Sequence, residues 1–99
     1  TILTQNSTNI QTQTQLDRIR KKELQRQENK LKKLIADCEH QISLLEEQIS
    51  EIEQLFSDPD FFSNKELYIE KRNKYNNFRE QLNQKYAEWE ELESKLMNL

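Results

Sequence analysis

A chain of 99 residues that has no glycine and one proline lacks the residues that most turns of a sheet-rich fold require. The same lack excludes glycine-rich phosphate loops, in which backbone must approach a phosphate without a Cβ in the way. Hydrophobic and charged residues each make up 33% of the chain, which is too little apolar surface for a globular core but enough for a two-helix coiled coil.

Net charge and cysteine content bear on the partners and the cellular compartment of the protein. The net charge of -3, from 15 basic and 18 acidic residues, indicates no particular partner. A single cysteine cannot form an intramolecular disulfide, so we expect an intracellular, cytoplasmic protein. No run of about 18 apolar residues is present, so we expect no membrane span and no membrane partner. A first residue Thr1 rather than Met suggests a fragment of a longer protein.

Residues 1–15 are uncharged and rich in Thr, Gln and Asn, which predicts a disordered polar linker. Thr14 and Asp17 have the spacing of a capping box. A first helix is therefore predicted over 16–57.

Apolar residues in that helix recur at alternating spacings of three and four, which indicates heptads with apolar a and d positions. We call this row of a and d residues the seam. Its d positions are Leu24, Leu31, Cys38, Leu45 and Ile52, and its a positions are Ile35, Ile42, Ile49 and Phe56.

The pattern stops at Ser57-Asp58-Pro59-Asp60, because proline cannot continue a helix, and a hairpin turn is predicted over 58–63. A second helix is predicted over 64–99, capped by Ser63 with Glu66 or, alternatively, by Asn64. Its seam is Tyr68, Lys71, Tyr75, Phe78, Leu82, Lys85, Trp89, Leu92, Leu96 and Leu99, where the two lysines are expected to lay their methylene stems along the apolar row.

Charge distribution predicts how the helices pair. In the first helix, residues 18–33 hold eight basic and two acidic side chains, and residues 34–56 hold six acidic and no basic ones. In the second helix, residues 65–85 hold six basic and three acidic side chains, and residues 86–99 hold one basic and four acidic ones. Folding back at Pro59 sets each block against its opposite, while a parallel self-pair would set like against like. The sequence therefore predicts an all-α, antiparallel two-helix coiled-coil hairpin, monomeric in isolation.

The basic block of the first helix is the main functional candidate, since phosphate backbones bind such clusters. For Lys30, Lys32 and Lys33 the favoured interpretation is pairing across the hairpin with Glu88, Glu90, Glu91 and Glu93. Contact with nucleic acid or with a neighbouring domain, and plain solvation, stay open for the cations further upstream, which we expect to project past Leu99 or to lie near it. The candidates on this helix are Arg18, Arg20, Lys21, Lys22 and Arg26.

Two further surfaces are candidates. Lys71, Arg72, Lys74 and Arg79 interleave with aromatic residues, as in single-strand binding surfaces, although those aromatics occupy seam positions and are expected to be core. At the tip, one of Phe61 and Phe62 is expected to cap the seam and the other to stay exposed as a protein contact.

No residue set predicts catalysis. Cys38 is expected to be a small buried hydrophobe, and His40 falls at f, facing water, so no metal site is expected. The carboxylates lie on an open rod, and no general acid or base is nominated. No cofactor is expected in these 99 residues.

Residues 17–99 resemble the C-terminal extension of bacterial ATP-binding cassette family F (ABC-F) ATPases. The resemblance lies in the order of four parts: a basic helix, the stretch LEEQISEIEQLFSDPDFF, a long helix and the stretch YAEWEELESKL. The most specific parts are 55–62, at the turn, and 86–92, at the base. The resemblance implies that this chain is a non-catalytic arm of a longer parent protein. That parent would hydrolyse ATP with Mg²⁺ on two cassettes outside this chain and would act in translation. The resemblance also implies that nucleic acid or the ribosome, and the parent's own cassettes, are partners. Linkers of that family are often rich in Lys and Ala, unlike residues 1–15.

Two functions therefore stay open: a nucleic-acid or ribosome-contacting arm, and a protein-interaction or spacer coiled coil that uses the tip and the acidic face. A dimerising coiled coil is a weaker third. The sequence also leaves open whether Tyr86 closes the base of the hairpin or faces a partner.

Overall fold

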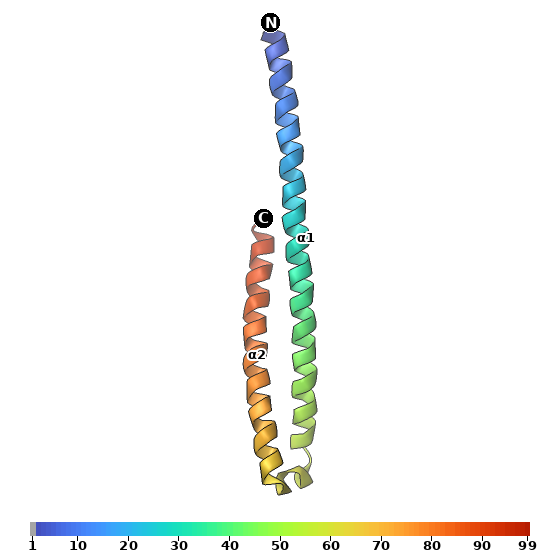
Figure 1. Cartoon of the computed structure of the whole chain (residues 1–99), viewed down its shortest axis with the longest axis vertical. Coiled ribbons are helices and arrows are strands. Elements are labelled where there is room, and N and C mark those ends of the chain that lie inside the picture. The colour runs from blue at the N-terminus through green and yellow to red at the C-terminus, as the bar shows by residue number, and fades with distance from the viewer. Residues whose placement is uncertain (1) are drawn as a thin grey trace.

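The computed structural model describes the backbone of residues 2–99 and the side chains of residues 12–99. It consists of helix α1 (Ile2–Phe56), a short 3₁₀ helix η1 (Pro59–Ser63) and helix α2 (Lys65–Met97). The two long helices run antiparallel, side by side, in a rod of 92 × 15 × 14 Å (Figure 1). The predicted all-α hairpin is confirmed, and neither helix in residues 2–99 is long and apolar enough to cross a membrane.

The core is the predicted seam. On α1 every seam residue between positions 35 and 52 is buried: Ile35, Cys38, Ile42, Leu45, Ile49 and Ile52. Those of α2 from Tyr68 to Leu96, including Lys71 and Lys85, are half-buried, because most are large aromatic residues or lysines that one facing helix covers only in part. Burial of an aliphatic side chain contributes about 1.5 to 3 kcal/mol, so the packing of these α1 residues against α2 is a main source of stability.

The seam ends earlier on α1 than the heptads predict. Leu24 is 49% exposed and Leu99 46% exposed, whereas Leu31 is half-buried. Leu24 and Glu28 line a shallow groove with Leu96 and Leu99 at the last turn of α2. The prediction of Leu24 as a core residue is wrong, because α2 ends at its level and no partner helix remains to cover it.

Helix α1 also begins earlier than predicted. Its first residue is Ile2, whereas the sequence predicts a linker over 1–15 and a helix start near residue 15. Thr14 and Asp17 therefore lie within the helix rather than at a cap. Neither glycine nor proline occurs before Pro59, and extending an existing helix needs no new nucleus, so the polar residues continue it. Thr1 and the side chains of 2–11 lie outside the described residues.

The hairpin turn contains a 3₁₀ helix that the sequence analysis did not predict. Asp58 caps it by accepting a hydrogen bond from the Asp60 amide at 3.0 Å, and Pro59 occupies the first turn, where no amide donor is needed. At the start of α2 the Asn64 side chain accepts from the Leu67 amide at 3.1 Å. Of the two predicted caps, Asn64 is therefore the one used; the Ser63 hydroxyl donates instead to the Asp60 carbonyl.

The predicted ion pairs across the hairpin are not formed. Within residues 12–99, the ion pairs all join residues of one helix: Lys32–Glu28, Lys74–Glu70, Lys85–Glu88 and Lys95–Glu91. The prediction for Lys30, Lys32 and Lys33 is wrong at the level of contacts. Lys33 occupies heptad position f, which faces away from the partner helix. Lys30 lines a groove between the helices with Glu91 but forms no ion pair with it, and Lys32 binds Glu28 at 2.9 Å.

Candidate nucleic-acid interface

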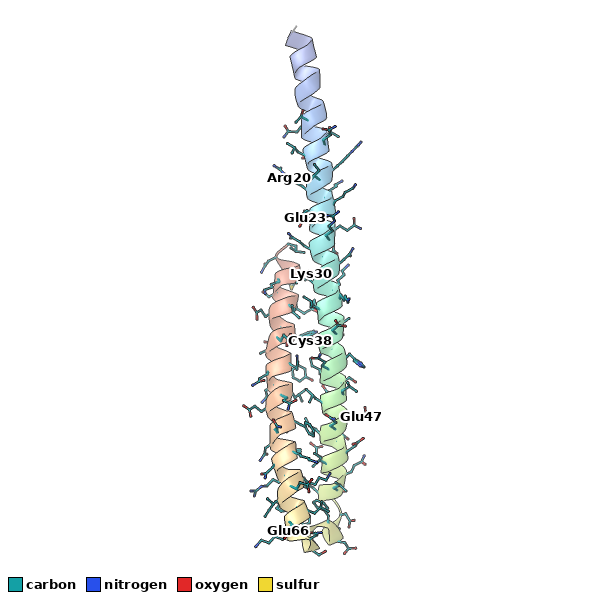
Figure 2. All side chains as sticks on the ribbon, viewed as in Figure 1. Arg20, Glu23, Lys30, Cys38, Glu47 and Glu66 are labelled. Atoms are coloured by element: carbon teal, nitrogen blue, oxygen red, sulfur yellow. The ribbon has the colours of Figure 1, made fainter. Side chains whose placement is uncertain are left out.

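The amino-terminal part of α1 extends as a single helix beyond the end of α2 (Figure 1). In Figure 2, Arg20 and Glu23 lie past the last turn of α2, and Lys30 lies beside it. We call residues 12–26 the overhang; its last residues, from Leu24, lie level with the end of α2, and the others lie past it. It arises because α1 has 55 residues and α2 only 33.

The overhang carries the five predicted cations of helix α1: Arg18, Arg20, Lys21, Lys22 and Arg26. All five are exposed, and none has a carboxylate oxygen within 4.0 Å among the described residues. From residue 18 to residue 26 there is one acidic side chain, Glu23. The structure thus places these cations on one stretch of α1, exposed and without an ion pair to the acidic end of α2.

The predicted lysines of α2 are engaged locally. Lys71 is half-buried in the seam, as its d position predicts. Lys74 forms an ion pair with Glu70 at 3.2 Å, one turn earlier on the same helix. Neither has the uncompensated exposure of the overhang cations.

The two arginines of α2 lie over tyrosine rings. Arg72 is 6.0 Å from the ring centroid of Tyr68, and Arg79 is 5.7 Å from that of Tyr75. Both tyrosines are half-buried seam residues, as predicted, so no row of exposed rings is available for stacking of bases.

The cations of α2 form no common surface with the overhang. Gln81 lines a shallow groove with Leu44 and Gln48, which sets the level of Arg79 along the rod. Leu44 is 18 residues along α1 from Arg26, and at 1.5 Å per residue this separates the two sets by roughly 27 Å. The overhang is therefore the compact candidate interface.

The tip is an aromatic cluster. Phe61 is buried and Phe62 is 50% exposed, so the prediction that one caps the seam and the other stays exposed is confirmed. The ring of Phe62 lies 5.3 Å from that of Tyr68 and 6.5 Å from that of Phe56, measured between centroids. The exposed face of Phe62 is thus held on a packed base.

A row of hydrogen bonds between the helices was missed by the sequence analysis. Three α1 glutamates at successive e positions accept from aromatic donors of α2. The pairs are Glu39 with Trp89 Nε1 at 3.2 Å, Glu53 with the Tyr75 hydroxyl at 3.3 Å, and Glu46 with the Tyr86 hydroxyl. The spacing of seven between the glutamates was the available signal. Tyr86 therefore contacts α1, and its hydrogen bond to Glu46, followed by burial, raises the pKa of the phenol.

Cys38 and His40 behave as their heptad positions predict. Cys38 is 3% exposed, and its thiol donates to the Lys85 carbonyl at 3.3 Å. Desolvation by burial, and then the charge of Glu88, raise the pKa of this thiol. His40 is exposed, and no group of three metal-ligating side chains occurs among the described residues.

Residues 20–94 match the profile of the ABC transporter C-terminal domain family, which is well over half of the chain. The chain belongs to this family. It is thus a C-terminal domain of the ABC protein class, and the matched residues include most of each long helix, the turn and part of the overhang. No curated protein and no solved structure matches the chain.

Proposed function

We propose that this ABC protein C-terminal domain is a non-catalytic arm that contributes nucleic-acid binding, to DNA or to ribosomal RNA, through the overhang. The observation that supports the proposal best is the group of five exposed cations, none of which has a carboxylate oxygen within 4.0 Å among the described residues. Cations already paired within the protein release fewer counterions from a phosphate backbone, so uncompensated ones are the stronger phosphate ligands.

The release of counterions from phosphates makes a quantitative prediction for the salt dependence of binding. If about four phosphates of a duplex are neutralised, log K against log salt has a slope near -3.6. A protein of net charge -3 has no general attraction to polyanions, so a slope of this size requires a local basic surface.

The test is fluorescence anisotropy of the full chain with labelled duplex DNA, branched DNA and structured RNA at about 50 and 200 mM salt. Arg18→Gln combined with Arg20→Gln is expected to weaken binding and flatten the salt dependence. The matched control removes two exposed cations near the tip, Lys65→Gln with Lys74→Gln. Equal losses in the two double variants, or no binding at the lower salt, would contradict the proposal.

The finer family assignment is also proposed. The turn around Pro59 and the Trp89-Glu90-Glu91-Leu92 stretch support an ABC-F parent that hydrolyses ATP with Mg²⁺ on its own cassettes, works on the ribosome in the cytoplasm and contacts this arm. The sequence of the complete reading frame tests it. Two cassettes on one chain without membrane spans are expected; a single cassette fused to a membrane domain would contradict the assignment.

A protein-interaction or spacer role is the second candidate, supported by the exposed ring of Phe62 at the end of a 92 Å rod. Phe62→Ala is expected to abolish capture of the partner by the full parent protein. Leu44→Ala, which removes a similarly exposed side chain from the middle of the rod, is the control. Unchanged capture by the Phe62 variant would remove the tip from consideration.

A further inference from the structure

The two sides of the paired rod differ in charge. We call the side on which the e positions of both helices meet the e flank. Beyond residue 34 of α1 its residues are Glu39, Glu46 and Glu53, and on α2 they are Arg72, Arg79, Tyr86 and Glu93. The three glutamates follow one another at about 10 Å, seven residues apart. On the opposite side the g positions of α1 from 34 to 55 carry no charge, so this row of carboxylates lies on one side only.

A hollow of about 270 Å³ opens on the e flank. Its lining residues are Glu39 and Ile42 of α1 and Tyr86 and Trp89 of α2. Ile42 is buried and supplies an apolar floor, while Tyr86 is 42% exposed and Trp89 is half-buried. The hollow therefore combines two partly exposed aromatic rings with a carboxylate.

Hydrogen bonds hold both rings of the hollow in place. The Trp89 Nε1 donates to Glu39 Oε1 at 3.2 Å, and the Tyr86 hydroxyl donates to Glu46 Oε1. The Oε2 atoms of the two glutamates take part in no hydrogen bond or ion pair within residues 12–99. An ionised carboxylate can accept several hydrogen bonds, so each glutamate keeps accepting capacity for a ligand.

The carboxylates around the hollow are not compensated by cations. Glu90 lies one turn beyond Tyr86 on the same side of α2, at a spacing of four residues. Glu93 lies one turn beyond Trp89 in the same way and is half-buried. Among the described side chains, no ion pair is formed by Glu39, Glu46, Glu90 or Glu93.

Cations that border this stretch are engaged by other groups. They are Lys32 with Glu28 at 2.9 Å, Lys85 with Glu88 at 3.0 Å, and Arg79 over the ring of Tyr75. The negative charge of the hollow is thus left for a ligand from outside the chain.

A guanidinium group suits both kinds of wall in this hollow. It stacks on aromatic faces, and its fork of N–H donors matches a carboxylate. A neutral ligand would leave the carboxylate charges unpaired. Because the glutamates repeat along the flank, a chain with several cations meets more of them than a single small amine does.

From this geometry we infer that the e flank binds a basic segment of a partner protein, with one arginine side chain in the hollow against Tyr86 and Trp89 and paired with Glu39. Glu46 and Glu93 accept neighbouring cations of the same segment. This inference goes beyond the proposed nucleic-acid function and does not involve the overhang.

The only tryptophan of the chain, Trp89, lines the hollow, so its fluorescence reports binding there. The full chain is titrated with a synthetic helical peptide that carries arginines at seven-residue intervals among uncharged residues. A second peptide has citrulline, which has the shape of arginine without its charge, at the same positions. The arginine peptide is expected to change the emission of Trp89 saturably and the citrulline peptide to leave it unchanged. Equal responses, or no response to the arginine peptide, would overturn the inference.

Two substitutions of equal charge test the position of the site. Glu39→Gln keeps an oxygen acceptor for Trp89 and is expected to lower affinity for the arginine peptide about two- to fivefold, as for an exposed ion pair. Glu47→Gln, on the side of α1 away from α2 (Figure 2), is expected to leave the affinity nearly unchanged. Circular dichroism checks that both variants keep their helices. Equal losses would show attraction to net charge alone and would overturn the site.

Two further measurements test the kind of ligand. Spermidine is expected to displace the arginine peptide only at a large excess; displacement at equal concentration would overturn a protein segment as the ligand. Sedimentation of the chain alone is expected to show a monomer, and a dimer lost in Glu39→Gln would assign the flank to a second copy instead. Glu39→Gln is also expected to retain any nucleic-acid binding, so failure of this inference and failure of the proposed function are distinguishable.

Discussion

The two parts of α1 are continuous in backbone and opposite in nearly everything else. From residue 35 to residue 52 every a and d side chain is buried against α2, and the acidic side chains are exposed, with Glu39 and Glu46 accepting hydrogen bonds from α2. From residue 12 to residue 26 every side chain is exposed, and the charges are mainly basic. Packing against α2 stabilises one part of α1, while the other part is an exposed continuation of the same helix.

This contrast separates the sources of stability from the sources of function. Hydrophobic burial and the aromatic hydrogen bonds to Glu39, Glu46 and Glu53 fix the pairing of the helices. No side chain of the overhang is buried, so its five cations can be changed without loss of a core contact. Substitutions in the two halves should therefore have separable effects.

The largest effect is expected in the seam. Ile49 is 5% exposed, and Ile49→Ala is expected to lower the free energy of unfolding by about 2 to 5 kcal/mol through lost burial and the cavity left behind. Leu24→Ala, at a d position of the exposed half, is expected to change it by less than about 0.5 kcal/mol. Urea unfolding followed by circular dichroism measures both. Equal losses would mean that the overhang is packed against something in solution.

A smaller effect is expected at the turn. Asn64→Ala removes the side-chain cap of α2 and is expected to cost about 1 kcal/mol. Ser63→Ala removes a hydrogen bond within η1 and is expected to cost less. If Ser63→Ala is the more damaging of the two, then the capping box predicted from the sequence forms in solution.

Alkaline pH should weaken one contact between the helices. The pKa of Tyr86 is raised above its ordinary value of 10.0, so its contribution is complete below pH 10.0 and is lost as pH rises through the higher value of the folded state. The stability of Tyr86→Phe is therefore expected to approach that of the native chain as the pH is raised past 10.0. Thermal unfolding of both chains from pH 7 upward tests this; a constant difference would contradict it.

The smallest effect on the unfolding midpoint is expected from breaking the overhang. Ile19→Pro should unwind α1 upstream of that residue, because proline lacks the amide and clashes with the preceding turn. Helical signal is expected to fall while the thermal midpoint of the hairpin stays the same. A lowered midpoint would show that the overhang stabilises the paired half, and would erase the distinction between them.

Heptad spacing predicted most of the fold. The alternation of three and four placed each buried residue from Ile35 to Ile52, and Pro59 marked the reversal of the chain. The same spacing did not show where burial stops, since Leu24 has the same heptad position as Leu31. The candidate site was predicted in part: the basic overhang follows from the unequal helix lengths, whereas the partners of Lys74, Arg72 and Arg79 depend on side-chain positions.

The sequence by itself determined the helical class, the site of reversal, the antiparallel direction and the excess of cations near one end of the rod. These depend on local periodicity, on one proline and on the order of charges along the chain. Only the tertiary structure decided which charges are compensated, that Asn64 rather than Ser63 caps α2, and that glutamates bind aromatic donors between the helices. Such contacts depend on the register between the two helices, and a seven-residue repeat is compatible with several registers.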